Sequence, residues 1–392
     1  MDGHIATGLL GAIRPDIAGL PESGIVEVVN AGRGKPDLIQ LWVGEGDQPT
    51  PSFIADAATR ALAEGHTFYT WQRGIPPLRE ALARYVSRIS GAAVPAEKIY
   101  VTIGGMQAIM MTMQALITPG DEVVMPVPVW PNIFSSVEIA GGCTVPVEIG
   151  VENGRWRLDL DRLFAACGPK TRALFLNSPG NPTGWTLTAE EQRAILEFCR
   201  PRGIWIVADE VYARFVYDRP AAPSFLAVAE PEDRLVVVNT FSKNWAMTGW
   251  RIGWVVASKE LGQVYENLQQ FNTSGVSTFL QYGALAAIEE GEPFVQSQID
   301  RCRTARDLVI GRLSSSPRVR LIRPDGAFYL FFGVDGEPDS RALALRLLHD
   351  ANVGLAPGSA FGPGGEGHLR LCFAGSIDRL ETAMDRLLPA LS

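Results

Sequence analysis

The chain contains 392 residues, of which 46% are hydrophobic and 20% are charged, and its formal net charge at pH 7 is −8. This length exceeds the size at which a single hydrophobic core usually stops growing, so we expect two domains in an ordinary globular protein. The 35 basic residues are outnumbered by 43 acidic ones and are spread thinly, which argues against nucleic acid as a partner.

The cysteines and the N-terminus indicate the compartment. The five cysteines are scattered, and none belongs to a C-x-x-C pair. This pattern argues against a disulfide framework or a metal site and favours a reducing environment. The first 13 residues make a poor signal peptide because Asp2 is acidic and no basic run precedes the apolar stretch. No apolar run approaches the roughly 20 residues that span a bilayer. We therefore expect a cytoplasmic protein with no membrane partner.

Short β-branched runs alternate with helical patterns through the middle of the chain. The predicted strands are 98–103, 122–125, 144–149, 172–177, 204–209, 234–240 and 249–256. Helices are expected between several of them, including 106–116 and 189–200, and Thr188 with Glu191 forms a capping box at the start of the latter. Alternating strands and helices predict an α/β fold with a mostly parallel, seven-stranded sheet that is buried on both faces.

The C-terminal part has a different pattern. It begins with a long amphipathic helix at 294–314 and continues with a strand near 326–330, a helix at 340–350, a strand at 368–373 and a closing helix. This order predicts a smaller α+β domain. We divide the chain into an N-terminal arm (1–32), a small domain (33–51 and 292–392) and a large domain (52–291).

The first predicted strand of the large domain leads into a pair of glycines. Gly104 and Gly105 precede the helix 106–116, so the amides of Gly105 and Met106 could approach a phosphate at the helix N-terminus. The segment is neither a Walker loop nor a dinucleotide-binding turn. Taken alone, it fits close packing at a helix start equally well.

Polar residues follow two of the later strands. The run 177–184, NSPGNPTG, begins at the end of one strand, and its Pro-Gly and Thr-Gly pairs predict a turn in any case. Asp209 ends the apolar strand 204–209. A buried acid is costly without a partner, although this one could also cap a helix or bind magnesium.

The strand 234–240 is followed by the most informative loop. Thr240 and Ser242 come shortly before Lys243, and Arg251 follows eight residues after it. Open α/β sheets bind ligands at the carboxyl ends of their strands, and hydroxyl groups with an arginine suit an anion held beside an amine. A surface loop with a solvated lysine is the simpler alternative for this segment alone.

Taken together, these motifs resemble the class I/II aminotransferases of the aspartate aminotransferase superfamily, which are fold-type-I pyridoxal phosphate enzymes. The pattern S-K-x-x-x-x-x-G-x-R-x-G is complete at Ser242, Lys243, Gly249, Arg251 and Gly253. The resemblance covers residues from about 40 to 375, with eight motifs in the family's order. It implies that the cofactor is pyridoxal 5′-phosphate and that 52–291 is the domain that binds it.

The resemblance also implies roles for the polar residues of the large domain. Lys243 would be the Schiff-base lysine, and Asp209 would face the pyridine nitrogen. Asn181 and Tyr212 would bind the ring hydroxyl. The phosphate would be bound by Thr240, Ser242, Arg251 and the amides of Gly105 and Met106. The catalytic group is therefore expected to be Lys243, Asp209 and Tyr212, with no metal.

Four further positions match motifs of the family, and for three of them a simpler explanation exists. Trp130 would stack on the cofactor ring, although it could be a core or interface tryptophan. Tyr69 would reach the cofactor phosphate of a neighbouring subunit, so we expect a homodimer, but the segment could be a loop before a helix. Gly44 would line the substrate carboxylate site with Asn181. Arg370 would bind the α-carboxylate through a bidentate pair, although a surface arginine on an edge strand is possible.

An acid at position 209 has a clear physical purpose in such an enzyme. Opposite charges about 4 Å apart interact by roughly 4 kcal/mol at an effective dielectric constant near 20. That energy corresponds to about three pKa units. The shift keeps a pyridine nitrogen protonated at neutral pH, and only the protonated ring is a good electron acceptor.

The expected reaction moves an amino group from an L-amino acid to a 2-oxo acid by a ping-pong mechanism. In bacterial relatives that favour aspartate, a lysine often follows the glycine pair, but this chain has Met106. We therefore expect neutral or aromatic side chains to be preferred, although Arg73 could supply a positive charge.

The alternative functions are a β-elimination lyase or another fold-type-I enzyme, a cofactor-sensing regulator, and a nicotinamide dehydrogenase. This chain lacks the glycine motif of a nicotinamide dehydrogenase. A regulator of this kind would carry an N-terminal DNA-binding domain, and only about 30 residues precede the fold here.

Overall fold

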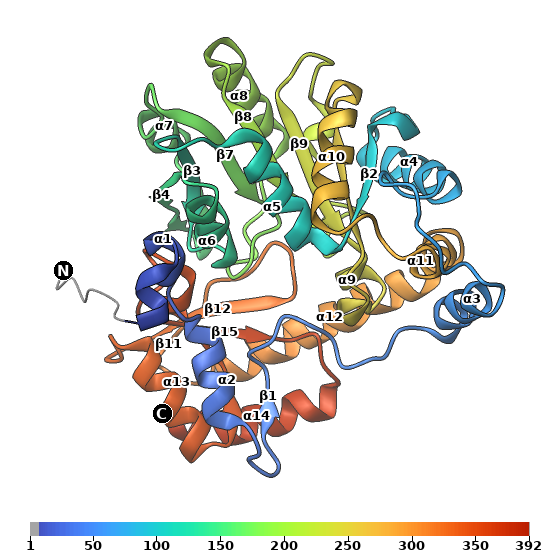
Figure 1. Cartoon of the computed structure of the whole chain (residues 1–392). Coiled ribbons are helices and arrows are strands. Elements are labelled where there is room, and N and C mark those ends of the chain that lie inside the picture. The colour runs from blue at the N-terminus through green and yellow to red at the C-terminus, as the bar shows by residue number, and fades with distance from the viewer. Residues whose placement is uncertain (1–7, 392) are drawn as a thin grey trace.

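The computed structural model describes residues 8–391, and within them the largest sheet has seven strands (Figure 1). In spatial order these are β2 (Ile99–Thr102), β10 (Gly253–Ala257), β9 (Leu235–Thr240), β8 (Trp205–Asp209), β7 (Thr171–Asn177), β3 (Glu122–Val127) and β4 (Cys143–Glu148). Strand β10 is antiparallel to both of its neighbours, and every other adjacent pair is parallel. The predicted seven-stranded, mostly parallel sheet is confirmed.

Helices cover both faces of this sheet because its central strands are mostly apolar. Every residue of β9 is buried. Helices α5 (Gly104–Leu116), α6 (Asn132–Ile139) and α10 (Gly262–Asn272) share one hydrophobic core with the sheet. Helices α4 (Pro76–Ser90), α7 (Leu160–Ala165) and α8 (Ala189–Cys199) belong to the second core. Burial on two faces explains the continuous apolar runs from which the strands were predicted.

A second sheet is formed mainly by the C-terminal third of the chain. Its strands, in order, are β11 (Val319–Arg320), β12 (Tyr329–Val334), β15 (His368–Cys372) and β14 (Ala356–Pro357). The helices α12 (Glu292–Leu313), α13 (Ser340–Asp350) and α14 (Ile377–Ala390) accompany it. Helix α2 (Gly24–Gly32) contacts α13 and β14, and β1 (Ile39–Gln40) pairs with β13 (Val353–Gly354). The N-terminal segment therefore lies beside the C-terminal elements, as Figure 1 shows.

The remaining elements connect or flank these layers. They are the helices α1 (Pro15–Ala18), α3 (Ser52–Ala63), α9 (Phe241–Asn244) and α11 (Thr278–Glu290) and the hairpin β5 (Gly150–Glu152) and β6 (Arg155–Arg157). The short 3-10 helices are η1 (Gly8–Ala12), η2 (Ala96–Lys98), η3 (Arg200–Arg202), η4 (Phe225–Ala227), η5 (Thr248–Trp250), η6 (Lys259–Leu261) and η7 (Gly358–Phe361). Across residues 8–391, none of the helices has the length and apolar character to span a bilayer.

Most predicted elements are present, and the differences have local causes. The predicted strand 249–256 is wrong over its first four residues. Thr248–Trp250 is a 3-10 helix, Arg251 has φ 52°, and β10 begins only at Gly253. The predicted helix 189–200 ends at Cys199, and Arg200 begins the 3-10 helix η3, in which Pro201 has no N–H to continue the α-helical hydrogen bonds. The predicted capping box is confirmed, since Thr188 and Glu191 exchange side-chain-to-backbone hydrogen bonds.

Candidate active site

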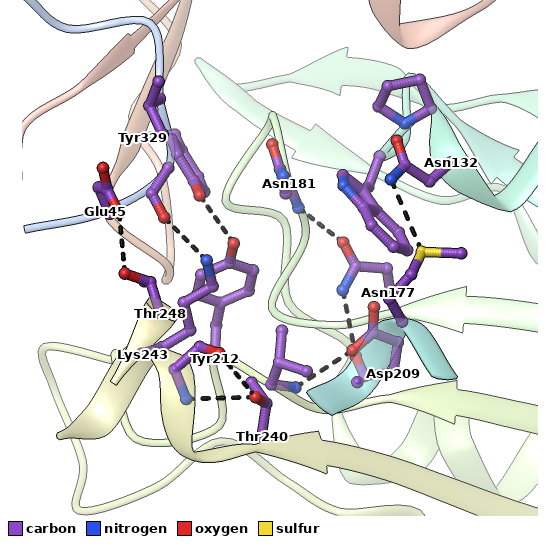
Figure 2. Close-up of a pocket in the computed structure, with 18 of the residues that line it drawn as sticks. Glu45, Asn132, Asn177, Asn181, Asp209, Tyr212, Thr240, Lys243, Thr248 and Tyr329 are labelled. Atoms are coloured by element: carbon purple, nitrogen blue, oxygen red, sulfur yellow. Dashed lines mark hydrogen bonds between the residues drawn. The ribbon is translucent and has the colours of Figure 1, made fainter. Parts of the chain in front are cut away.

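The carboxyl ends of the central strands open into one cavity, whose volume is about 320 Å³. Strand β8 leads into it through Asp209, and β9 leads into it through Thr240 and the short helix α9. The first turn of α5 forms another wall. Figure 2 shows polar side chains from these elements directed toward one another. The site therefore lies where open α/β sheets usually bind ligands.

Lys243 is the amine of this cavity. Helix α9 carries it immediately after β9, and its Nζ donates a hydrogen bond to the carbonyl oxygen of Gly44 at 2.8 Å. Burial lowers the pKa of the Lys243 ammonium to about 8, and the nearby guanidinium groups of Arg370 and Arg251 act in the same direction. At neutral to mildly alkaline pH a useful fraction of this amine is uncharged and able to act as a base or nucleophile.

Asp209 is a buried acid that has little to stabilise its charge. The residue is 4% exposed, and one carboxylate oxygen accepts a hydrogen bond of 3.3 Å from the amide of Val211. Burial raises the pKa of the Asp209 carboxyl to about 7, while the Val211 amide and the charge of Lys243 oppose the rise. A carboxylate in this position would be stabilised by a cation that enters the cavity.

Two hydrogen-bonded pairs border these groups. The hydroxyls of Tyr212 and Tyr329 are 2.7 Å apart, and burial raises the pKa of Tyr212 well above its ordinary value. Asn177 donates to the carbonyl oxygen of Asp209 at 3.2 Å and accepts from the amide of Asn181 at 2.8 Å. These contacts hold Asn181 and Tyr212 at the cavity, as Figure 2 shows.

The first turn of α5 faces the loop that follows β9. The leading N–H groups of a helix lack partners within it, so Gly105 and Met106 offer amides beside the hydroxyls of Thr240 and Ser242, which are 2.9 Å apart. Arg251 lies against the same turn, since a Cβ added to Gly104 would be 2.7 Å from its Nη2 atom. These donors form an anion-binding surface.

Arg370 is a second candidate anion ligand and is almost completely buried. Strand β15 places it at 3% exposure, where Nη1 donates to Asn181 Oδ1 at 2.9 Å and Nη2 donates to the carbonyl oxygen of Trp42. Its Nε has no hydrogen-bond partner. Unlike the many paired arginines of residues 8–391, neither Arg370 nor Arg251 contacts a carboxylate. A buried cation without a counter-ion suits an anionic ligand.

Of the remaining predicted site residues, some line the cavity and one does not. Trp130 and Met106 line the cavity, and the sulfur of Met106 accepts a hydrogen bond from Asn132 at 3.6 Å. Gly44 also lines it, and a side chain there would collide with the hydroxyl of Tyr329. Tyr69 does not line the cavity of its own chain and is 92% exposed.

Asn177 and Tyr329 are among the lining residues that the sequence analysis missed. Asn177 ends a buried strand in the same way as Asp209, so that pattern could have identified it. Tyr329 begins β12. Nothing in its local sequence separates it from core aromatic residues, because its place at the site depends on how the second sheet packs against the first.

The donor set fits one cofactor. A buried amine can condense with an aldehyde, a buried carboxylate can pair with a cationic ring nitrogen, and the anion-binding surface can hold a phosphate. Pyridoxal 5′-phosphate has these three groups. The fold and the cavity together define a fold-type-I enzyme that depends on this cofactor.

Comparison with known proteins identifies the family. The profile of aminotransferase class I and II matches residues 36–387. An aspartate aminotransferase of Geobacillus stearothermophilus is 35% identical, with 90% of each chain covered. Aromatic-amino-acid aminotransferase 2 of Thermococcus litoralis is 35% identical, covering 93% of this chain and 94% of the relative. A solved structure of a single mutant of Thermus thermophilus aspartate aminotransferase is 35% identical, with a TM-score of 0.90 and coverage of 97% and 99%.

These findings establish the class of reaction. The chain belongs to the class I and II aminotransferase family and is a pyridoxal-phosphate-dependent transaminase. A transaminase exchanges an amino group between an amino acid and a 2-oxo acid. Because relatives of equal similarity are named for aspartate and for aromatic amino acids, membership of the family leaves the preferred side chain open.

Proposed function

We propose that this transaminase moves the amino group of an L-amino acid with a neutral or aromatic side chain to a 2-oxo acid by a ping-pong mechanism. The observation that carries the proposal is the character of the cavity wall around Met106. Met106 accepts a hydrogen bond from Asn132, and the lining residues Ile25, Ile109 and Trp130 of the same cavity are also uncharged. A distal carboxylate on the substrate would find no cation among them, whereas an apolar side chain would be desolvated favourably.

Arg73 was the one residue that could have supplied a positive charge. In this chain it does not line the cavity, and its Nε lies 2.5 Å from Glu266 Oε1 in an ion pair. Its guanidinium also lies over the ring of Tyr100. These contacts engage its charge outside the site, which supports a preference for uncharged side chains.

The proposed roles of the remaining residues follow the contacts described above. Bound pyridoxal 5′-phosphate supplies a cationic ring that accepts the electron pair of the substrate Cα–H bond. Asp209 keeps the proton on the ring nitrogen, and Asn181 and Tyr212 bind the ring hydroxyl. Trp130 stacks on the ring. The phosphate is bound by Thr240, Ser242, Arg251 and the amides of Gly105 and Met106.

Lys243 and Arg370 act on the substrate. Arg370 binds the α-carboxylate, helped by Asn181 and by the backbone at Gly44, and this fixes the Cα–H bond relative to Lys243. The Lys243 amine removes the Cα proton and later returns it as a general acid. Its lowered pKa, about 8, suits both directions of proton transfer near neutral pH. Since Arg370 is the single buried guanidinium that lines the described cavity, donor and acceptor bind there in turn.

The quaternary structure is a second part of the proposal. Large apolar side chains are exposed on two adjoining segments, and Gln72 joins them through a 2.6 Å hydrogen bond to Gln270. These side chains are Phe68, Tyr69, Trp71 and Phe271. Exposed aromatic groups of this size are typical of protein interfaces. We infer a homodimer in which Tyr69 reaches the cofactor phosphate of the partner subunit. The cytoplasmic location also stays a prediction, which the five unbridged cysteines support.

A donor panel tests the proposed substrate class. Purified holoenzyme is assayed with phenylalanine, leucine, aspartate and glutamate as donors, each with several 2-oxo acid acceptors, and kcat/KM is compared. We expect the neutral and aromatic donors to have the higher values and the double-reciprocal plots to be parallel. The proposed preference is wrong if aspartate or glutamate is the best donor. Intersecting lines would contradict the ping-pong mechanism.

Two further assays test the proposed chemistry. Borohydride reduction followed by peptide mass spectrometry is expected to attach the cofactor to Lys243 and to no other amine. A cysteine-type substrate without a 2-oxo acid is expected to release no pyruvate or ammonia, and rapid release would instead indicate the β-elimination lyase considered from the sequence.

A further inference from the structure

A second cavity lies outside the active site and shares none of its lining residues. Its volume is about 580 Å³, which is within the usual range for a small-molecule site. The wall is formed by the β5–β6 hairpin, the N-terminus of α8, the loop at Tyr217, one turn of α12 and the loop at Asp325. We call it the arginine cavity because it is lined by Arg155, Arg157, Arg219, Arg306 and Arg323.

The cations of the arginine cavity outnumber their counter-ions. Asp325 pairs with both Arg155 and Arg157, the latter at 3.3 Å. Asp307 pairs with Arg306 at 2.9 Å and with Arg323 at 3.1 Å. One carboxylate neutralises one charge, so Asp325 and Asp307 each leave one arginine charge unbalanced. Arg219 pairs with Asp218 at 2.8 Å, and Glu191 adds one negative charge to the lining, which leaves an excess of one positive charge. A local excess of this kind is notable in a chain whose net charge is −8.

The deepest of these cations is held in a fixed position. Arg306 is 7% exposed, and its guanidinium lies 4.3 Å from the centroid of the Tyr217 ring. The hydroxyl of Tyr217 donates to the carbonyl oxygen of Ala327 at 2.5 Å. Because this guanidinium is already buried and oriented without a ligand, it loses little side-chain entropy when an anion binds, and this favours anion binding.

The same loops connect the arginine cavity to the active site. The amides of Asp325 and Gly326 donate to the carbonyl oxygen of Gly184 at 3.1 and 2.8 Å, and Gly184 closes the loop that carries Asn181. The segment then continues into Tyr329, which hydrogen-bonds Tyr212 in the active site. A ligand that changed the position of Asp325 in the arginine cavity would therefore also affect Asn181 and Tyr329, which line the active site.

We propose that the arginine cavity binds a phosphorylated small molecule and that its binding raises the KM for the amino donor. Planar guanidinium groups match phosphate oxygens bidentately, and the half-exposed Arg155, Arg157 and Arg323 are open to a ligand. A phosphate competes with Asp325 for Arg155 and Arg157. The Asp325 loop then supports Gly184 less firmly, and Asn181 holds Arg370 less well for the substrate carboxylate.

Titration calorimetry with pyrophosphate tests the binding. The holoenzyme is used, so that the phosphate site of the cofactor is already filled. We expect saturable binding that is at least about tenfold weaker in the double variant R157Q/R323Q, because two charged hydrogen-bond donors are lost. The control R312Q removes an arginine of α12, the helix that carries Arg306, and this arginine pairs with Asp385 away from the cavity. The affinity of R312Q should equal that of the wild type.

Two further comparisons separate the proposal from a general effect of charge. The variant R157K/R323K keeps both charges without the fork geometry and should lie between the wild type and R157Q/R323Q. Citrate should bind more weakly than pyrophosphate, and pyrophosphate should raise the donor KM in the wild type but not in R157Q/R323Q. The binding proposal is overturned if pyrophosphate does not bind the wild type at millimolar concentration, if R157Q/R323Q binds it equally, or if citrate binds as well. An unchanged KM overturns the proposed coupling.

Discussion

Asp209 is buried and Lys243 is partly buried in the active-site cavity, and both have few hydrogen bonds of their own. Burial shifts both pKa values toward the neutral forms, raising that of Asp209 to about 7 and lowering that of Lys243 to about 8. Groups held in such unfavourable surroundings are concentrated at functional sites. A bound cationic ring would relieve the cost of ionising Asp209, so the same buried carboxyl is unfavourable in the cofactor-free protein and useful in the holoenzyme.

We expect Asp209→Asn to raise the stability of the cofactor-free protein at pH 8 and to lower the activity of the holoenzyme. The folded-state pKa of Asp209 is above the unfolded value, so the folded protein binds more protons between about pH 4 and 7 and loses stability as the pH rises through that window. At pH 8 the cofactor-free variant should be more stable by up to the order of 4 kcal/mol, and the gain should vanish near pH 4. Its kcat/KM should fall about 1000-fold. Thermal melts at three pH values and a turnover assay measure both effects, and a variant that is less stable at pH 8 would contradict the argument.

Met106 is the residue at which substrate preference should be changed most easily. It lines the cavity from the first turn of α5 and contacts Asn132. Met106→Lys places an ammonium group where an uncharged side chain now contacts Asn132. We expect kcat/KM for aspartate to rise at least about tenfold and that for phenylalanine to fall. Met106→Leu keeps the wall apolar and should preserve the wild-type order of donors. Equal changes in the two variants would show that the residue acts through packing rather than charge.

At the scale of elements, the loop between β7 and α8 depends on a glycine. Gly184 has φ 69°, and a Cβ there would collide with Pro324 and the carbonyl oxygen of Gly326. Gly91 also has positive φ, 76°, but an added Cβ would meet nothing within 4 Å. Gly91→Ala should therefore cost only about 1 kcal/mol of unfolding free energy. Gly184→Ala should cost about 1–3 kcal/mol more and also raise the substrate KM, because the loop carries Asn181. Chemical denaturation and steady-state kinetics distinguish the two variants, and equal effects would contradict the role of close packing.

The central sheet could be predicted because its strands are buried on both faces and therefore have continuous apolar sequences. Predicted strand 172–177 differs from β7 by one residue, and helix 340–350 coincides with α13. The strand prediction for 249–252 failed because a local turn replaces the strand there. Arg251 adopts a left-handed conformation and donates to the carbonyl oxygen of Thr248 at 2.6 Å. Its apolar residues gave no indication of that turn.

The candidate site could be predicted where its residues occur in continuous motifs. Lys243, Asp209 and Arg251 were found in this way and line one cavity. Tyr329 could not be found, because it is an ordinary aromatic residue in its local sequence and reaches the cavity only through the packing of the two sheets. The residue roles and the division into domains stay predictions.

At the scale of the whole molecule, the active site joins parts that are distant in the sequence. Asn181 follows a strand of the large sheet and bonds Arg370 of the second sheet, while Tyr212 and Tyr329 form the same kind of link. The Lys243 amine reaches the carbonyl of Gly44 in the N-terminal segment. Each sheet supplies groups that the other must hold in place, so the site exists only when the two are packed together.

The proposed dimer extends this dependence to a second chain. Phe271 is 84% exposed on α10, so Phe271→Glu should leave an isolated subunit folded but disrupt an apolar interface. We expect light scattering to show monomers, and cofactor release to be at least about tenfold faster because Tyr69 no longer reaches the partner's phosphate. Val151→Glu alters an exposed residue of the β5–β6 hairpin and should remain dimeric. Tyr69→Phe should weaken cofactor binding without dissociating the dimer. If Phe271→Glu stays dimeric and Tyr69→Phe retains the cofactor normally, these aromatic residues do not form the interface.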